Sequence, residues 1–132
     1  MKYFNIGNEA LKPYKEYDEF TLYCIDISNR TAGLELFLSS WETDHIQTVV
    51  DNALRTAFEE HNLYKVYVNI IRDDYCLYET LEKMNFVFES IHRAQYFDSK
   101  YHDIVYMTVL RPEWERGGIK YRFNYHKYDY EN

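Results

Sequence analysis

The stretch S-S-W-E-T-D-H-I-Q, residues 39–47, joins a strand-like run to a long amphipathic helical pattern. A helix entrance is a natural place to bind an anion, because its first backbone N–H groups lack internal partners and carry the positive end of the dipole. Nucleotide-binding folds often place glycines there, but this stretch has none and contains two acids, Glu42 and Asp44. Asp44 and Gln47 have the spacing of a capping box, so we expect them to satisfy the N–H groups that a phosphate would use.

The other reactive side chains form no recognisable catalytic or metal-binding pattern. His92, His102 and His126 lack metal-ligand spacing, so we expect no metal site. Cys24 and Cys76 lie inside apolar runs, which favours buried free thiols in a reducing compartment. No serine or cysteine stands in the context of a nucleophile elbow.

Composition excludes several classes of protein. A chain of 132 residues with 46% hydrophobic and 28% charged residues suits one soluble globular domain. The net charge of −7 argues against a nucleic-acid or anionic-membrane partner. No run approaches the ~20 apolar residues of a membrane span, and the N-terminus lacks the apolar region of a signal peptide. We therefore expect a cytoplasmic protein.

The aromatic share is high, at 19% of the chain with 15 tyrosines. Tyrosine fills the core of a small domain while keeping a polar tip, and it also lines grooves and oligomer interfaces. Composition does not separate these uses.

The elements that position these groups begin with two strands and a helix. Residues 20–27 and 34–38 are rich in β-formers and flank the turn signal at 28–31, which predicts a hairpin. A helix follows and ends at 61–62. Its buried face recurs at helical spacing through Ile46, Val49, Val50, Ala53, Leu54, Ala57 and Phe58.

The second half continues with a strand, a helix and a hairpin. Residues 66–71 form a strand that is apolar on both faces, as in a central or parallel position. Asp73 and Asp74 are suited to cap a second helix, and 86–97 and 104–110 are strands joined by a turn, with Pro112 as the stop. The order strand-strand-helix-strand-helix-strand-strand predicts a mixed α/β (α+β) sheet with two crossover helices. We assign one domain to residues 1–116 and an aromatic-rich tail to 117–132, whose 121–125 segment alternates like a strand or a partner-covering arm.

Residues 30–115 resemble the GNAT superfamily of N-acetyltransferases, and most closely the branch that acetylates ribosomal-protein N-termini. Three segments carry the resemblance: A-F-E-E-H-N-L-Y-K-V-Y-V-N-I at 57–70, L-E-K-M-N-F at 81–86, and F-E-S-I-H-R-A-Q-Y-F-D-S-K-Y-H-D-I-V-Y-M-T-V-L-R-P-E-W at 88–114. The second is similar to the family's E-K-L-G-F helix end, and the third to its E-G-x-x-R, D-G-x-x-x-D and M-x-x-L-x-x-E-W finish.

The resemblance implies a cofactor and a site for it. Acetyl-CoA lies between two splayed central strands in this family, with its pyrophosphate on the N-terminus of the central helix in a loop of the form Q/R-x-x-G-x-G/A. The pantetheine arm pairs with strand backbone. By position alone, the cofactor-binding residues here are Leu36, Phe37, Leu38, Asp44, His45 and Ile46.

The resemblance also implies catalytic residues for transfer of an acetyl group to an amine. Glu35 lies in the strand that borders the acetyl group, and it is our candidate base. The family's acid, a tyrosine, falls on Leu81 here. Tyr78 lies one helical turn earlier and Tyr75 two turns earlier, so Tyr78 is our candidate acid.

The chain departs from the family at three places. No register supplies a glycine to the phosphate loop, and losing two or three hydrogen bonds of about 1.5–3 kcal/mol each would weaken a micromolar ligand to millimolar or worse. We therefore expect weak or no acetyl-CoA binding through this loop. Asn85 replaces the glycine of E-K-L-G-F and tolerates the same left-handed backbone. About twenty residues precede Phe20, so we expect part of the family's N-terminal wall of the acceptor groove to be missing.

These departures leave three hypotheses. The first is a compact N-acetyltransferase that uses acetyl-CoA and an amine acceptor. The second is a non-catalytic GNAT-fold module that binds a protein or another ligand. The third is half of an assembly, such as a homo-oligomer, in which a partner subunit supplies the missing elements.

Overall fold

The N-terminal hairpin of the sheet is confirmed. A computed structural model describes residues 11–116, in which β1 (Phe20–Asp26) pairs antiparallel with β2 (Thr31–Leu36). The second strand begins at Thr31 and ends at Leu36, so it lies earlier than the predicted 34–38. The turn explains the difference, because Asp26 accepts hydrogen bonds from the backbone and side-chain nitrogens of Asn29 and Arg30 takes a left-handed φ of 58°. Because the turn is this tight, β2 begins directly after it, at Thr31.

The long helix has the predicted buried face but not the predicted cap. α1 (Thr43–Arg55) buries Ile46 and the apolar side chains that follow it at helical spacing, and a π-helical turn, η1 (Thr56–Glu60), continues it to His61. Its N-cap is Glu42, whose side chain makes no capping hydrogen bond. The expected Asp44–Gln47 capping box is therefore wrong, because the helix begins one residue before Asp44 and places that residue inside the first turn.

The second half of the chain follows the predicted order. β3 (Lys65–Ile71) leads into α2 (Tyr75–Lys83), whose N-cap Asp74 accepts from the Leu77 N–H at 3.3 Å. Asn85 has a φ of 75°, which confirms the left-handed helix end. The hairpin of β4 (Val87–Phe97) and β5 (Lys100–Leu110) is longer than expected, and α3 (Arg111–Glu115) follows with Pro112 in its first turn, where proline costs no hydrogen bond.

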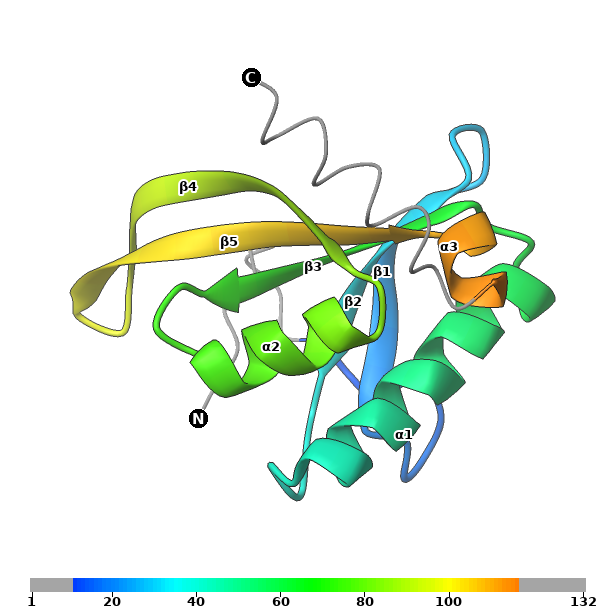
Figure 1. Ribbon diagram of the computed structural model, residues 1–132, viewed down its shortest axis with the longest axis horizontal. Coiled ribbons are helices and arrows are strands. Elements are labelled where there is room, and N and C mark those ends of the chain that lie inside the picture. Colours follow the sequence, from blue (N-terminus) through cyan, green and yellow to red (C-terminus); the bar gives the residue numbers. More distant parts are fainter. Residues whose placement is uncertain (1–10, 117–132) are drawn as a thin grey trace.

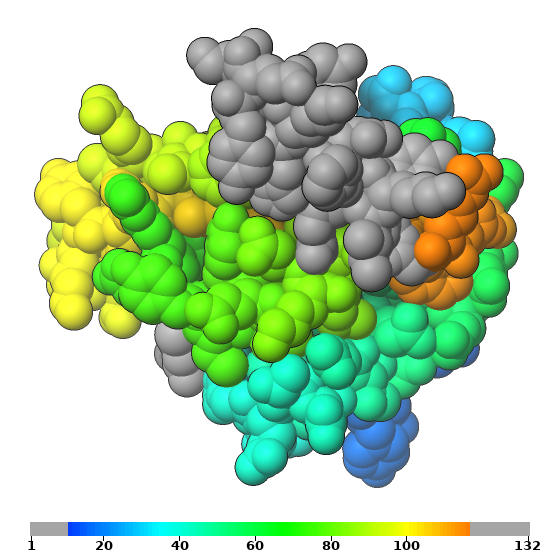
Figure 2. All heavy atoms as spheres, viewed as in Figure 1, coloured from blue at the N-terminus to red at the C-terminus, as the bar shows by residue number. Residues whose placement is uncertain are grey.

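The five strands of residues 11–116 form one mixed sheet in the order β1-β2-β3-β5-β4, and of the pairs between them only β2–β3 is parallel (Figure 1). The predicted mixed α/β fold is confirmed. α1 and α2 pack against each other, and in the view of Figure 2 they form neighbouring parts of the surface. The core lies between these helices and the sheet.

The sheet has two unlike faces. Val66, Val68 and Ile70 of β3 belong to the core beneath the helices. Successive strand residues point to opposite faces, so Lys65, Tyr67 and Asn69 project from the other face, together with their neighbours on the adjoining strands. We call this side the second face.

The cysteine expectation is wrong in one respect. Cys24 and Cys76 are free thiols, but both are exposed. Cys24 takes a φ of 49° where the β1–β2 register shifts, and this bulge turns it outward. Cys76 stands beside Leu77, which faces the core, and so falls on the outer side of α2.

Neither a long apolar helix nor a metal-binding cluster occurs in residues 11–116. No described helix is long and apolar enough to cross a membrane. Within the same residues, no group of three or more His, Cys, Asp or Glu side chains is arranged to hold a metal ion. The tail at 117–132, with its predicted strand at 121–125, lies outside the described residues, as does His126.

Candidate functional site

A gap opens between the two parallel strands at the centre of the sheet. β2 and β3 are in register from Thr31 opposite Lys65 to Gly33 opposite Tyr67, yet β2 continues to Leu36 and β3 to Ile71. Figure 1 shows the two strands diverging beyond this short ladder. The gap lies at the carboxyl ends of both strands, which is where ligands bind in open α/β sheets.

The entrance of α1 follows directly from the end of β2. The first helical hydrogen bond runs from the Ile46 N–H to the Glu42 carbonyl at 3.0 Å, so the amides before Ile46 belong to the open first turn. Glu19 holds the loop between β2 and α1 in place. Its carboxylate accepts a hydrogen bond from the Ser39 N–H and lies 3.0 Å from His45 Nε2. The hydrogen bond with His45 is the main cause that lowers the pKa of Glu19.

Glu35 projects from the second face at the edge of this gap. It sits in β2 opposite Thr21 of β1, two residues beyond Gly33, and only 8% of it is exposed. Burial raises the pKa of Glu35 from an ordinary 4.5 to about 7. A carboxyl group with this pKa exists in both protonation states near neutrality and is suited to proton transfer.

Glu35 has a polar neighbourhood on the second face. Asn69 Nδ2 donates a hydrogen bond to the Tyr23 hydroxyl at 3.2 Å. Burial raises the pKa of Tyr23 to about 12, and the negative charge of Glu35 adds to the shift. The amide of Asn69 thus links β3 to β1 beside the gap.

Tyr78 lies on the other side of the sheet. It belongs to α2, its side chain is partly buried, and it packs against the core. Tyr75 is exposed, and Leu81, at the family's tyrosine position, is fully buried. Of these three side chains, Tyr78 therefore remains the candidate acid, approaching from the face opposite to Glu35.

The residues expected to hold acetyl-CoA divide into two sets. The Phe37 N–H donates to the Glu19 carbonyl on the β1 side at 2.7 Å. Because neighbouring amides in a strand point to opposite edges, the backbone of Leu36 faces the gap, and the side chain of Leu38 packs on the core.

The second set is the start of α1. Asp44 is exposed, His45 is paired with Glu19, and the side chain of Ile46 is fully buried. Only backbone groups of this set are therefore placed to meet a phosphate.

The site fits one part of acetyl-CoA better than the other. Within residues 11–116, the gap leaves the facing β2 and β3 backbone without a cross-strand partner, and this backbone suits an extended amide-bearing arm such as pantetheine. The open first turn of α1 offers N–H donors, but Glu42 and Asp44 bring negative charge to it and no glycine lets a pyrophosphate approach.

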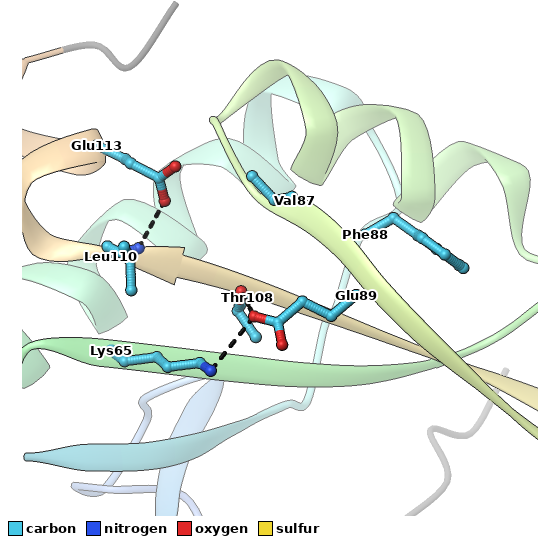
Figure 3. Close-up of a pocket in the computed structure, with 7 residues that line it drawn as sticks. All are labelled: Lys65, Val87, Phe88, Glu89, Thr108, Leu110 and Glu113. Atoms are coloured by element: carbon cyan, nitrogen blue, oxygen red, sulfur yellow. Dashed lines mark hydrogen bonds and ion pairs between the residues drawn. The ribbon is translucent and has the colours of Figure 1, made fainter. Parts of the chain in front are cut away.

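A cavity of about 400 Å³ lies where β3 and β4 begin and β5 ends, away from the gap (Figure 3). Its polar side is formed by Lys65, Glu89 and Thr108: Lys65 Nζ lies 3.3 Å from Glu89 Oε2, to which the Thr108 hydroxyl also donates. Thr108 stands opposite Tyr67 in the β3–β5 ladder, so the cavity adjoins the second face.

The sequence patterns did not single out Tyr23, Tyr67, Asn69 or Tyr106. The signal that was available is alternation: in 66–71, Tyr67 and Asn69 are the residues out of phase with Val66, Val68 and Ile70. We interpreted this run as a strand buried on both faces, because Ile71 and the β-branched residues masked the period of two.

Comparisons with solved structures show which fold this arrangement shares. The fold, with its five-stranded mixed sheet and crossover helices, is that of the GNAT acetyltransferases. No protein-family model matches the sequence, and no curated protein matches it either.

Three solved structures illustrate the similarity. One, named Probable acetyltransferase, is 24% identical with a TM-score of 0.64 over 72% of this chain and 56% of its own. Spermidine N-acetyltransferase SpeG from Vibrio cholerae in complex with CoA and spermine is 22% identical, with a TM-score of 0.64 over 71% of this chain and 57% of its own. The dodecameric form of the Vibrio cholerae enzyme is 21% identical, with a TM-score of 0.63 over 70% and 56%. The chain therefore spans less than two thirds of the length of each.

Proposed function

We propose that this protein transfers an acetyl group from acetyl-CoA to an amine, with the strand gap rather than the helix entrance as its main hold on the cofactor. The observation that carries this proposal is Glu35, a buried carboxyl group with a pKa of about 7 at the edge of the β2–β3 gap. A general base that works near neutrality needs a pKa in this range, and carboxyl groups with pKa values shifted this far cluster at functional sites.

The chain's own residues would act from both faces of the sheet. Acetyl-CoA, when bound, supplies a thioester whose C–S bond breaks as a C–N bond forms with the amine. Glu35 takes a proton from the bound ammonium on the second face, and the free amine then attacks the thioester carbon. Tyr78 gives its hydroxyl proton to the departing thiolate from the helix side, and the backbone of Leu36 holds the arm in the gap.

The similar structures support this reaction class. The Vibrio cholerae protein was solved with CoA and spermine, so a fold of this kind accommodates both a CoA arm and an amine. We also propose that the chain works as a homo-oligomer, since that enzyme forms a dodecamer. Light scattering tests this second point, and a folded monomer at micromolar concentration would refute it.

The test of activity is release of free thiol from millimolar acetyl-CoA in the presence of a panel of amines. We expect slow turnover that rises with pH through about 7, as Glu35 loses its proton. Glu35→Gln should lower kcat by about 10²–10⁴. The matched control is Glu60→Gln, which alters an exposed glutamate of η1 and should leave turnover unchanged. Turnover that Glu35→Gln does not reduce would overturn the role of Glu35.

A second function is favoured by a different observation. Glu42 and Asp44 flank the open first turn of α1, where they repel phosphate. A GNAT-fold module that binds a protein or forms oligomers without catalysis would retain the gap and lose the anion site in this way. Absence of thiol release with every amine, together with no thermal shift at millimolar acetyl-CoA, would favour this module over the enzyme.

A further inference from the structure

Three tyrosines and a histidine form a row across four strands of the second face. The rings of Tyr23 and Tyr67 meet edge to face with centroids 6.0 Å apart. Tyr67 stacks on Tyr106 at 5.3 Å, and Tyr106 lies 6.1 Å from the ring of His92. All three tyrosines are partly exposed, so the row presents ring surface beside the strand gap.

Two oxygen acceptors lie beside this row, the side-chain oxygen of Asn69 and the carboxylate of Glu35. The amide nitrogen of Asn69 donates a hydrogen bond to Tyr23, while its buried Oδ1 receives no hydrogen bond in the part of the chain that the structure describes. Asn69 is 3% exposed, and a buried acceptor without a donor is costly. Glu35 on the neighbouring strand adds a carboxylate. The cation that projects from β3 toward this row, Lys65, is paired with Glu89 at 3.3 Å.

We propose that this row, with Glu35 and Asn69, is an acceptor site for a primary ammonium on an apolar stem, and that it rejects amines that carry a carboxylate on the neighbouring carbon. The proposal rests on the acetyl transfer proposed above and names the class of amine that this transfer uses. The tyrosine faces attract the cation, and the Asn69 oxygen and Glu35 take its N–H donors.

The rejection follows from the same inventory. An amino acid would bring its carboxylate within a few ångströms of Glu35, where like charges repel in a partly buried site. Lys65, the lysine that projects from β3 on this face, is already paired with Glu89. A neutral carboxamide in the same position adds bulk without charge, so it separates the two effects.

The experiment compares phenethylamine, phenylalaninamide and phenylalanine as ligands and as acceptors, with binding measured by calorimetry without acetyl-CoA and acetylation by thiol release. We expect phenethylamine to bind best, phenylalaninamide next, and phenylalanine at least about tenfold more weakly than the amide. Equal binding of phenylalanine and phenylalaninamide would overturn the proposal. Binding in this order without any acetylation would uphold the acceptor site and refute the proposed transferase.

Variants test whether the row itself holds the cation. Tyr67→Leu removes the central ring and should weaken phenethylamine binding on the order of tenfold, whereas Tyr67→Phe keeps the ring and should stay within about twofold. The matched control is Tyr101→Leu, which replaces an exposed tyrosine at the start of β5, next to the turn from β4. Thermal unfolding confirms that each variant is folded. Should Tyr67→Leu not fold, Asn69→Leu is expected to weaken phenethylamine binding by a similar factor. Unchanged phenethylamine binding in a folded variant of either kind would refute the proposed ammonium site.

Discussion

The ring of Tyr23 lies directly over Gly33. A Cβ atom placed on Gly33 would stand 2.4 Å from the Cζ atom of Tyr23, closer than any real contact of this kind. The Tyr23 ring is held in this position, because Asn69 donates a hydrogen bond to its hydroxyl and Tyr67 packs against it edge to face. Gly33 is also the last residue of β2 in register with β3, so this contact stands where the strand gap begins.

Gly33→Ala is therefore expected to destabilise the protein although alanine suits a strand better than glycine. Overpacking of this kind costs about 1–3 kcal/mol, against a gain of about 0.4–1 kcal/mol from the stiffer unfolded chain. We expect a net loss of about 1–2 kcal/mol in the free energy of unfolding, measured by urea denaturation.

The Tyr23→Ala background provides the control for this substitution. With the ring gone, Gly33→Ala should become neutral or stabilising by about 0.4–1 kcal/mol, so its sign reverses. The same loss in both backgrounds would show that the contact with Tyr23 is not the cause.

Glu35 makes the stability of the fold depend on pH. Its pKa is about 7 in the folded chain and an ordinary 4.5 when unfolded, so between these values the folded state binds more protons than the unfolded one. Stability then falls as pH rises through this window, by up to about 3 kcal/mol. Below pH 4.5 the penalty from Glu35 is absent, and above pH 7 it is fully present.

Glu35→Gln should abolish this slope. The variant is expected to be more stable than the parent at pH 8 and to lose that advantage at pH 4.5, as followed by chemical denaturation across the range. Glu60→Gln, at an exposed site, should leave the slope in place. Parallel pH profiles for the parent and Glu35→Gln would contradict the burial of a charged carboxylate at this position.

Local patterns predicted most of the fold. The helical period from Ile46 to Phe58 predicted the buried face of α1 and η1, and Asp74 and Asn85 predicted the two ends of α2. Each of these signals comes from side chains that are close together in the sequence. The hairpins were also predicted, but β2 and β5 begin three and four residues earlier than expected. For β2 the reason is the turn that Asp26 and Asn29 close through side-chain hydrogen bonds, which a strand pattern does not contain.

The site was harder to predict because it is assembled across strands. Glu35 and Tyr78 came from the resemblance, and the pKa of Glu35 depends on burial that only the packed sheet produces. Asp44 and Gln47 had capping spacing, but spacing alone does not fix where a helix starts. The neighbours of Glu35, Tyr23 and Asn69, meet through a contact between β1 and β3 that no local window includes.

Asn85 ends α2 in a backbone conformation that most side chains avoid. Its φ is 75°, and its N–H donates to the Glu82 carbonyl at 3.0 Å. Asn85→Ala should lower the free energy of unfolding by about 1 kcal/mol, because alanine lacks the tolerance of asparagine for the left-handed region. Asn85→Gly should leave the free energy of unfolding unchanged within a few tenths of a kcal/mol. Thermal or urea unfolding of the pair checks the prediction, and an alanine variant as stable as the glycine variant would contradict it.

Glu42 and Asp44 at the entrance of α1 limit how much the phosphates of acetyl-CoA contribute to its binding. Acetyl-pantetheine has the arm and the thioester of acetyl-CoA but lacks its phosphates. If the gap provides most of the binding, the two thioesters should have dissociation constants within roughly threefold of each other, because Glu42 and Asp44 offset what the helix N–H groups contribute.

Removing the acids should separate the two ligands. Each charge repels a phosphate several ångströms away by about 0.5–1 kcal/mol in a solvated setting, so Glu42→Gln with Asp44→Asn should tighten acetyl-CoA binding about tenfold. Acetyl-pantetheine should be unaffected, and molar salt should erase most of the gain by screening. The side chain of Glu42 does not cap α1, so its replacement leaves the helix intact. Calorimetry with both ligands decides the matter, since equal tightening of acetyl-pantetheine would mean that the acids act on the gap and not on the phosphates.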